Sequence, residues 1–159
     1  MGLHVKASDV PWLAPKNTEV LTEELGIELA MVYGEKFDVM IARRQPGYHS
    51  TPHRHESEQV NYCIKGKMWS YIDDDVVLIE EGDFRRIPAW STHWAWNRFD
   101  EECVMLEVHA PMSHIERHVP FAIGLFADGE EPRIEHAKPI EYTSADIAAV
   151  IEQKIDARG

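Results

Sequence analysis

Residues 47–66 read GYHSTPHRHESEQVNYCIKG, and residues 82–97 read GDFRRIPAWSTHWAWN. Both segments contain short β-prone runs bounded by glycines, a pattern typical of strands joined by turns. His53 and His55 are two positions apart, so on an extended chain both imidazoles project from one face and can hold a single ion. The second segment adds His93, which we place on a neighbouring strand. The three histidines therefore predict one divalent metal site.

Further strands are expected on both sides of these segments. Apolar and β-branched runs, separated by turn residues such as Gly66 and Gly82, occur at 27–33, 37–42, 59–64, 68–72, 76–79, 84–88, 93–97 and 103–109. Short strands at such regular spacing favour an all-β fold, either an antiparallel barrel or a sandwich. No helix of useful length fits within the central part of the sequence.

The C-terminal part of the sequence predicts one helix. Thr143 and Ser144 can cap its start, and Asp146 completes a capping-box-like beginning. Apolar residues then recur at helical spacing, at Ile147, Val150, Ile151 and Ile155. We expect an amphipathic helix that packs on the sheet or on a partner subunit.

Length and composition favour a single domain over residues 1–159, with a barrel core at about 27–111 and a C-terminal extension at 112–159. The 159 residues contain no internal repeat and no Gly/Pro-rich linker. A chain of this length removes roughly 70% of its unfolded surface from water, which is enough for one core without a metal or a disulfide. A bound metal would therefore serve chemistry rather than folding.

The charge balance and the hydropathy exclude several kinds of partner. The 16 Lys+Arg and 28 Asp+Glu residues give a net charge of −12, and the few basic pairs form no stripe, so nucleic acid is not an expected partner. No apolar run approaches the roughly 20 residues that cross a bilayer, so no membrane partner is expected. Cys63 and Cys103 lie in apolar runs, which fits buried thiols in a reducing compartment. We expect a cytoplasmic protein.

The two quoted segments resemble the paired motifs of the cupin superfamily, G-x5-H-x-H-x3-E-x6-G and G-x5-P-x-G-x2-H-x3-N. The matching positions are Gly47, His53, His55, Gly66, Gly82, Pro88, His93 and Asn97. The resemblance implies a jelly-roll barrel, the cupin double-stranded β-helix, with a metal ion in its interior. The ligands it implies are His53, His55, His93 and the residue at the glutamate position. It says little about residues 112–159.

Two positions depart from these motifs. The glutamate position holds Gln59, and Trp90 replaces the glycine that follows Pro88. A glutamine ligand binds through its neutral amide oxygen, so the ion would keep its full positive charge and favour an anionic substrate. Glu58 could be the fourth ligand instead if the hairpin shifts in register, and Glu56 is a weaker alternative.

Residues 103–111 resemble the closing strand of small cupin enzymes. Alternation places Met105, Glu107 and His109 on one face of this strand. In cupins that process uronate sugars, whose three-His, one-Gln ligand set is similar, an acidic residue at the position of Glu107 faces the metal. The resemblance implies that Glu107 transfers protons and that His109 is a second pocket residue. The opposite orientation, with an exterior Glu107 paired with Arg or Lys, stays open.

Aromatic residues beside the ligand strands are weaker candidates for substrate contact. Tyr48 and His49 lie in the loop before the first ligand strand, and Trp90 lies in the turn before the second. Alternation points Trp94 and Trp96 away from the metal face, so we expect both in an inter-sheet or subunit contact.

Two further groups of residues were weighed as binding sites. Arg54 and Arg98 flank the ligand strands and could hold a carboxylate, although arginine is more often a surface residue. His114 and His118 could mimic a metal-binding pair, but prolines bracket their segment and no third ligand is near. We assign no site to this histidine pair.

These patterns favour a metal-dependent enzyme that uses one divalent ion (Zn, Ni, Mn or Fe) as a Lewis acid. Its substrate would be an oxygen-rich, anionic small molecule, and its chemistry that of an isomerase, lyase or cyclase. One alternative is a non-haem iron dioxygenase that cleaves an aromatic or diketone substrate, and another is a non-catalytic ligand-binding or sensor protein. The resemblance also implies a homodimer formed by paired sheets.

Overall fold

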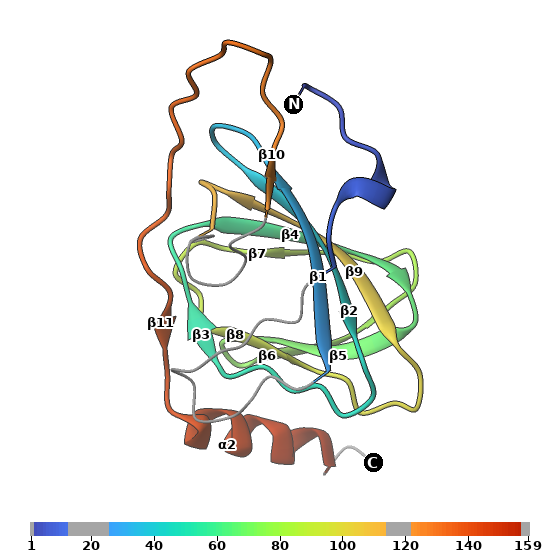
Figure 1. The fold of residues 1–159 in the computed structure, drawn as a ribbon. Coiled ribbons are helices and arrows are strands. Elements are labelled where there is room, and N and C mark those ends of the chain that lie inside the picture. Colours follow the sequence, from blue (N-terminus) through green and yellow to red (C-terminus); the bar gives the residue numbers. More distant parts are fainter. Residues whose placement is uncertain (1, 13–25, 114–121, 157–159) are drawn as a thin grey trace.

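Two β-sheets face each other around an interior cavity, and a helix lies against the outside of one of them (Figure 1). The structure is a computed structural model and describes residues 2–12, 26–113 and 122–156. Its elements in chain order are the 3-10 helix η1 (Ala7–Asp9), β1 (Ile27–Tyr33), β2 (Asp38–Arg44), β3 (His53–Arg54), β4 (Glu58–Lys65), β5 (Lys67–Ile72), β6 (Asp75–Glu80), β7 (Phe84–Ile87), β8 (His93–Trp96), β9 (Cys103–Ala110), β10 (Ile123–Gly124), β11 (Glu141–Tyr142) and the helix α2 (Ala145–Asp156).

The order of the strands is that of a jelly roll. The six-stranded sheet runs β10-β1-β2-β9-β4-β7, and the five-stranded sheet runs β11-β3-β8-β5-β6. Strands that are distant in sequence become neighbours, because β9 lies antiparallel between β2 and β4, and β8 lies antiparallel between β3 and β5. The expected all-β jelly-roll barrel with a C-terminal helix is confirmed.

The period of two along each strand decides which side chains enter the barrel. In β9, every second residue from Cys103 to His109 is buried, and the residues between them are only half-buried. In β4 the buried positions are Gln59, Asn61 and Cys63. Since β9 pairs with β4, the inward residues of both strands form one continuous patch on the inner wall.

The turns at the motif glycines have a conformation that suits glycine. Gly66 joins β4 to β5 with a φ of 77°, and a Cβ there would collide with the backbone oxygen of Glu102. Trp90 replaces the glycine expected two positions after Pro88, and it still adopts a φ of 63°. This left-handed conformation costs residues other than glycine about 1–2 kcal/mol of conformational free energy. Its backbone N–H donates to the carbonyl of His55 at 2.7 Å. This hydrogen bond connects the second motif to the first, although tryptophan stands at the position of the motif glycine.

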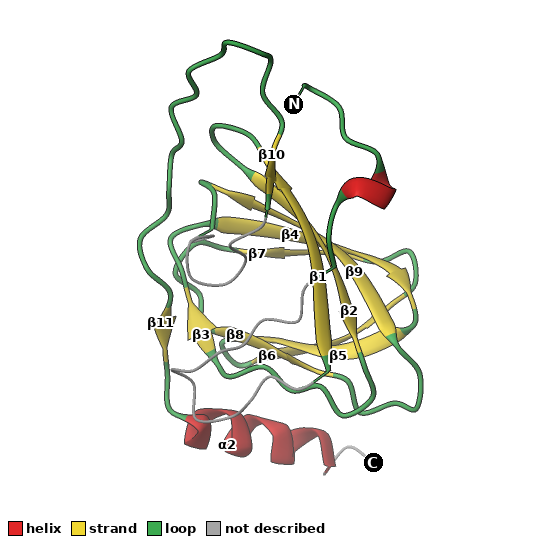
Figure 2. Cartoon of the chain, viewed as in Figure 1, coloured by secondary structure: helices red, strands yellow, loops and turns green. Residues whose placement is uncertain are grey.

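Helix α2 packs on the outer face of the five-stranded sheet (Figure 2). The Ser144 hydroxyl accepts a backbone N–H of the first turn at 3.2 Å, as the predicted cap requires. Ala148 and Ile151 are buried against the stacked rings of Tyr71 and Trp94. The helix was expected to pack on the sheet or on a partner subunit, and in the structure it packs on the sheet. No helix in the part of the chain that the structure describes is long and apolar enough to cross a membrane.

The C-terminal extension also contributes to the cavity. After β10 the chain runs as an extended loop along one side of the barrel before it reaches β11 (Figure 1). This path brings Ile140 and Tyr142 to the cavity lining. The segment that was least readable from the sequence therefore forms part of the wall around the site.

Candidate metal centre

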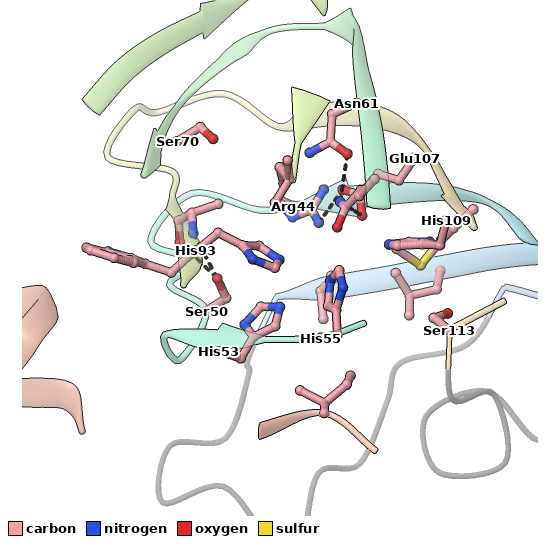
Figure 3. A pocket seen from close by; sticks show the side chains of 18 of the residues that line it. Arg44, Ser50, His53, His55, Asn61, Ser70, His93, Glu107, His109 and Ser113 are labelled. Atoms are coloured by element: carbon pink, nitrogen blue, oxygen red, sulfur yellow. Dashed lines mark hydrogen bonds and ion pairs between the residues drawn. The ribbon is translucent and has the colours of Figure 1, made fainter. Parts of the chain in front are cut away.

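Three histidines from two strands converge inside the barrel (Figure 3). His53 lies on β3 and pairs directly with His93 on β8, while His55 follows β3 by one residue. One ring nitrogen from each histidine lies within 4.8 Å of those of the other two. The structure therefore brings together the three imidazoles predicted to share a metal ion.

Backbone carbonyls orient all three rings. The Nδ1 atom of His53 lies 2.7 Å from the carbonyl oxygen of Thr51. The Nδ1 atoms of His55 and His93 each lie 2.9 Å from the carbonyl oxygen of Ser57 and Ser91, respectively. A carbonyl oxygen can only accept, so each Nδ1 carries the proton and each Nε2 keeps its lone pair for a ligand bond.

The surroundings of His55 and His93 favour neutral imidazoles, the form that binds metals. Burial, followed by the charge of His109, lowers the pKa of His55. Burial, followed by the charges of His53 and His55, holds the pKa of His93 well below its ordinary value. Three imidazole nitrogens around one point fit zinc, nickel, manganese or iron as a divalent ion.

Of the three candidates for the fourth ligand, Gln59 points into the cavity. Its amide nitrogen donates to Asn61 at 2.7 Å and to Glu107 at 3.2 Å, so its amide oxygen is the atom available to act as a ligand. Glu58 points out of the barrel and pairs with Arg86. Glu56 pairs with Lys138 at the surface. Gln59 stays the predicted ligand.

Glu107 lies inside the barrel and is 2% exposed, so the exterior orientation that was left open is not the one observed. Its Oε1 atom forms an ion pair of 2.5 Å with Nη2 of buried Arg44, at the end of β2. Burial alone would lower the pKa of Arg44, but the charge of Glu107 raises it overall. Arg44 lies outside both motifs, so no pattern in the sequence predicted its place in the cavity.

His109 is held by a buried carboxylate that the sequence analysis also missed. Its Nδ1 lies 2.7 Å from Oδ1 of Asp38, which is fully buried on β2. The other oxygen of Asp38 accepts the N–H and the hydroxyl of Ser113, at 2.7 and 2.6 Å. Burial alone lowers the pKa of His109, but the charge of Asp38 raises it overall. Asp38 thereby fixes the ring orientation of His109 in the cavity.

Of the three candidate substrate contacts, Tyr48, His49 and Trp90, only the first lines the cavity. Tyr48 is buried and lines the cavity. His49 and Trp90 are not among the lining residues: Nε2 of His49 lies 2.7 Å from a carboxylate oxygen of Glu152 on α2, and Trp90 lies under Lys138. For these two residues, nothing in the geometry supports a contact with a ligand in the cavity.

The tryptophans of β8 lie near α2. Trp94 donates its indole N–H to Glu152 at 2.9 Å, and Trp96 packs against Arg98. The two rings were expected in a contact between sheets or between subunits, and a contact with this helix was not predicted.

The remaining candidate binding residues are two arginines, which lie away from the cavity, and two histidines, which are not among the described residues. Arg54 pairs with Glu141 at the surface, and Arg98 pairs with Asp156 of α2. Neither arginine lines the cavity. His114 and His118 lie outside the described residues.

Comparisons with known proteins agree with this geometry. Residues 40–109 match the Cupin domain family. No curated protein matches the sequence. Among solved structures, a cupin-2 domain protein from Rhodospirillum rubrum has a TM-score of 0.63 and 19% identity, with 98% of this chain and 94% of that chain covered.

Two enzymes have a similar fold over a shorter length. A sugar phosphate isomerase of the cupin superfamily from Silicibacter pomeroyi has a TM-score of 0.61 and 18% identity, covering 67% of this chain and 74% of its own. The polyketide cyclase RemF from Streptomyces resistomycificus has a TM-score of 0.57 and 20% identity, covering 67% and 78%. The family match and the paired motifs identify residues 40–109 as a cupin domain, and the solved structures share its fold.

Proposed function

We propose that this protein is an enzyme that uses one divalent metal ion as a Lewis acid on an anionic small molecule bound through its oxygen atoms. The observation that carries the proposal is the meeting of the His53, His55 and His93 ligand nitrogens within 4.8 Å, in the cavity that also holds Glu107 and His109. In this proposal the amide oxygen of Gln59 completes the ligand set.

The proposed ligands carry no charge, and this property determines the kind of substrate. Three imidazoles and one amide leave the ion its full positive charge, which attracts an anion and stabilises negative charge that develops on a bound oxygen. Reactions that pass through an enolate-like state, such as isomerisation, elimination or cyclisation, require this stabilisation together with a group that moves a proton.

Glu107 and His109 are the groups proposed to move or hold that proton. His109 receives its orientation from Asp38, so its second nitrogen is available as an acid or a base on the cavity side. Glu107 has one oxygen bound to Arg44 and the other to the Gln59 amide. Its charge is therefore held in place beside the proposed Gln59 ligand, where it can also orient that amide.

The test is a screen for turnover by the zinc-loaded and nickel-loaded protein, with sugar acids and β-dicarbonyl compounds as substrates. We expect Glu107→Gln and His109→Gln to lower kcat/KM at least about 100-fold, the size of a typical general acid–base contribution. Arg54→Gln is the matched control, because Arg54 lies at the surface with Glu141. Absence of turnover with every redox-inert metal would contradict the proposal.

Two other functions give distinguishable results in the same screen. A three-histidine site also accepts ferrous iron, and oxygen consumption that depends on ferrous iron would identify a dioxygenase instead. A ligand-binding or sensor protein would bind its ligand equally well after Glu107→Gln and would show no turnover with any metal. Elemental analysis of protein purified without added metal indicates which arm of the screen to favour.

A further inference from the structure

The cavity has one wall that is entirely apolar. β1 directs Ile27, Leu29 and Met31 inward, and all three line the cavity together with Met40 of β2. We call these four residues the apolar wall. Met31 pairs with Met40, and Met40 pairs with Glu107 of β9. The apolar wall therefore begins one strand away from the polar groups beside the triad.

Several polar side chains of the lining are engaged with the protein itself, whereas the Nε and Nη1 atoms of Arg44 have no hydrogen-bond partner. The Ser50 hydroxyl accepts a backbone N–H of β8 at 2.9 Å, and the Ser113 hydroxyl donates to Asp38 at 2.6 Å. Glu107 is bound to Arg44. Figure 3 shows the Arg44–Glu107 ion pair at the cavity. A ligand rich in hydroxyls would leave several of them without partners, at about 1–3 kcal/mol for each buried group.

The basic side chains Arg44 and His109 of the lining are already paired with carboxylates, Glu107 and Asp38. Arg44 is the only lysine or arginine among the described residues that line the cavity, and its charge is balanced by Glu107. A carboxylate placed far from the proposed metal would thus have no cation of its own. We therefore expect the negatively charged group of the ligand to bind at the histidine triad.

The volume of the whole cavity, which includes the space at the triad, limits the size of the ligand. It measures about 150 Å³, and an apolar cavity of this volume in another protein holds a benzene molecule. Burial of apolar surface contributes about 25 cal/mol per Å². A ring-sized apolar group on the apolar wall would therefore add substantially to affinity.

We infer that the ligand of this site has two distinct ends: an oxygen pair that binds at the histidine triad, and an apolar, ring-sized body that rests on Ile27, Leu29, Met31 and Met40. Aryl-substituted β-dicarbonyl compounds and phenolic enolates belong to this class, whereas polyhydroxylated sugar acids do not. The inference rests on the proposed function and names its substrate class.

The experiment is a calorimetric titration of three probes against the zinc-loaded protein: acetylacetone, benzoylacetone and galacturonate. We expect the phenyl group of benzoylacetone to raise affinity about tenfold over acetylacetone, and galacturonate to bind more weakly than either. The inference is overturned if galacturonate binds most tightly or if the phenyl group adds less than about twofold.

Near-isosteric variants locate the apolar body. Leu29→Asn and Met31→Gln should each remove most of the gain from the phenyl group, and zinc content and acetylacetone affinity should stay unchanged. Val32→Thr is the matched control, because Val32 lies on β1 at an outward position. An equal loss in Val32→Thr, or unchanged benzoylacetone binding in both inward variants, would also overturn the inference.

The same titrations on metal-free protein separate the two proposals. If the protein binds no zinc, the metal proposal fails, while a phenyl gain that persists and disappears in Leu29→Asn still supports the apolar wall. If zinc binds and the phenyl group adds nothing in either form, the metal proposal stands and this inference is wrong.

Discussion

At the scale of single residues, the triad is held in a metal-binding form by its neighbours. Each of His53, His55 and His93 points Nδ1 at a backbone carbonyl within two positions of its own. These carbonyls belong to the same loops as the histidines, so the ring orientation is set locally. Such support is typical of preorganised ligands, whose rings do not have to be ordered when the metal binds.

Replacement of one triad member should abolish tight metal binding. In His93→Ala, the ion would lose one of three imidazoles and keep a site open to water. We expect zinc affinity to fall at least about 100-fold, measured by competition with a chelator and by elemental analysis. The control is His4→Ala, because His4 is exposed. Full retention of zinc by His93→Ala would contradict the site.

The two thiols should be unreactive in the folded protein. Burial, followed by the charge of Cys63, raises the pKa of Cys103 to about 12, and burial also raises the pKa of Cys63. A thiol-specific disulfide reagent at pH 8 should therefore label neither cysteine before unfolding and both after it. Rapid labelling of the native protein would show that the thiols are accessible.

The same shift gives a pH dependence of stability. The unfolded thiol of Cys103 titrates near its ordinary pKa of 9.0, whereas the folded thiol keeps its proton up to about pH 12. The folded state then binds more protons than the unfolded state, so the free energy of unfolding falls as the pH rises above about 9. Urea unfolding at pH 8 and pH 10, compared with a Cys103→Ala variant, measures the contribution of this thiol.

At the scale of elements, an apolar stripe and the carboxylate of Glu152 attach α2 to the sheet. The stripe consists of Ala148 and Ile151 against Tyr71 and Trp94. The carboxylate is that of Glu152, which accepts the indole N–H of Trp94 and contacts His49. Since His93 and Trp94 are adjacent on β8, the helix supports the strand that presents one of the triad histidines.

Deletion of the buried contact of α2 should weaken the fold. Ile151 is 8% exposed, whereas Val150 on the same helix is 63% exposed. We expect Ile151→Ala to lower the free energy of unfolding by about 2 kcal/mol, because a buried branched side chain is lost, and Val150→Ala to change it by less than about 0.5 kcal/mol. Equal effects of the two variants in urea unfolding would contradict this packing.

At the scale of the whole molecule, the outer face of the six-stranded sheet is unusually apolar. Strand pairing aligns two outward rows across it: Val32, Val39, Val108 and Val60, and beside them Ala30, Ile41, Leu106, Tyr62 and Phe84. Phe84 is 73% exposed and Val60 is 39% exposed. An apolar face of this kind is typical of a protein–protein contact, and the homodimer stays a prediction.

We therefore predict that two copies of the chain associate through this face. Sedimentation at micromolar concentration should give twice the mass of the 18.3 kDa chain. Val60→Lys should shift the protein to the monomer, because it places a charge within the apolar rows, beside Val108. Val77→Lys should not, although Val77 is equally exposed on β6 of the other sheet. A monomeric wild-type protein would contradict this prediction.

Local patterns made much of the site predictable. The parity of β9 placed Glu107 and His109 on one face, and that face is the inner one. The parity of β4 likewise separates Gln59 from Glu58. The roles of these residues and the cytoplasmic location stay predictions. His49 and Trp90 do not line the cavity. Their orientation could not be predicted, because loop side chains follow no period and the neighbours of these two residues come from α2 and from Lys138.

The sequence by itself determined the strands of the barrel core, their inward faces and the three imidazoles, because the alternation of an extended chain and the glycine turns are local properties. It did not predict β10 and β11, which lie in the C-terminal extension. Only the tertiary structure decided that Arg44 neutralises Glu107 and that Asp38 orients His109, which is 71 positions away. These partners meet because β2 pairs with β9. That pairing depends on the packing of the whole barrel, since no pattern within either strand specifies its neighbour.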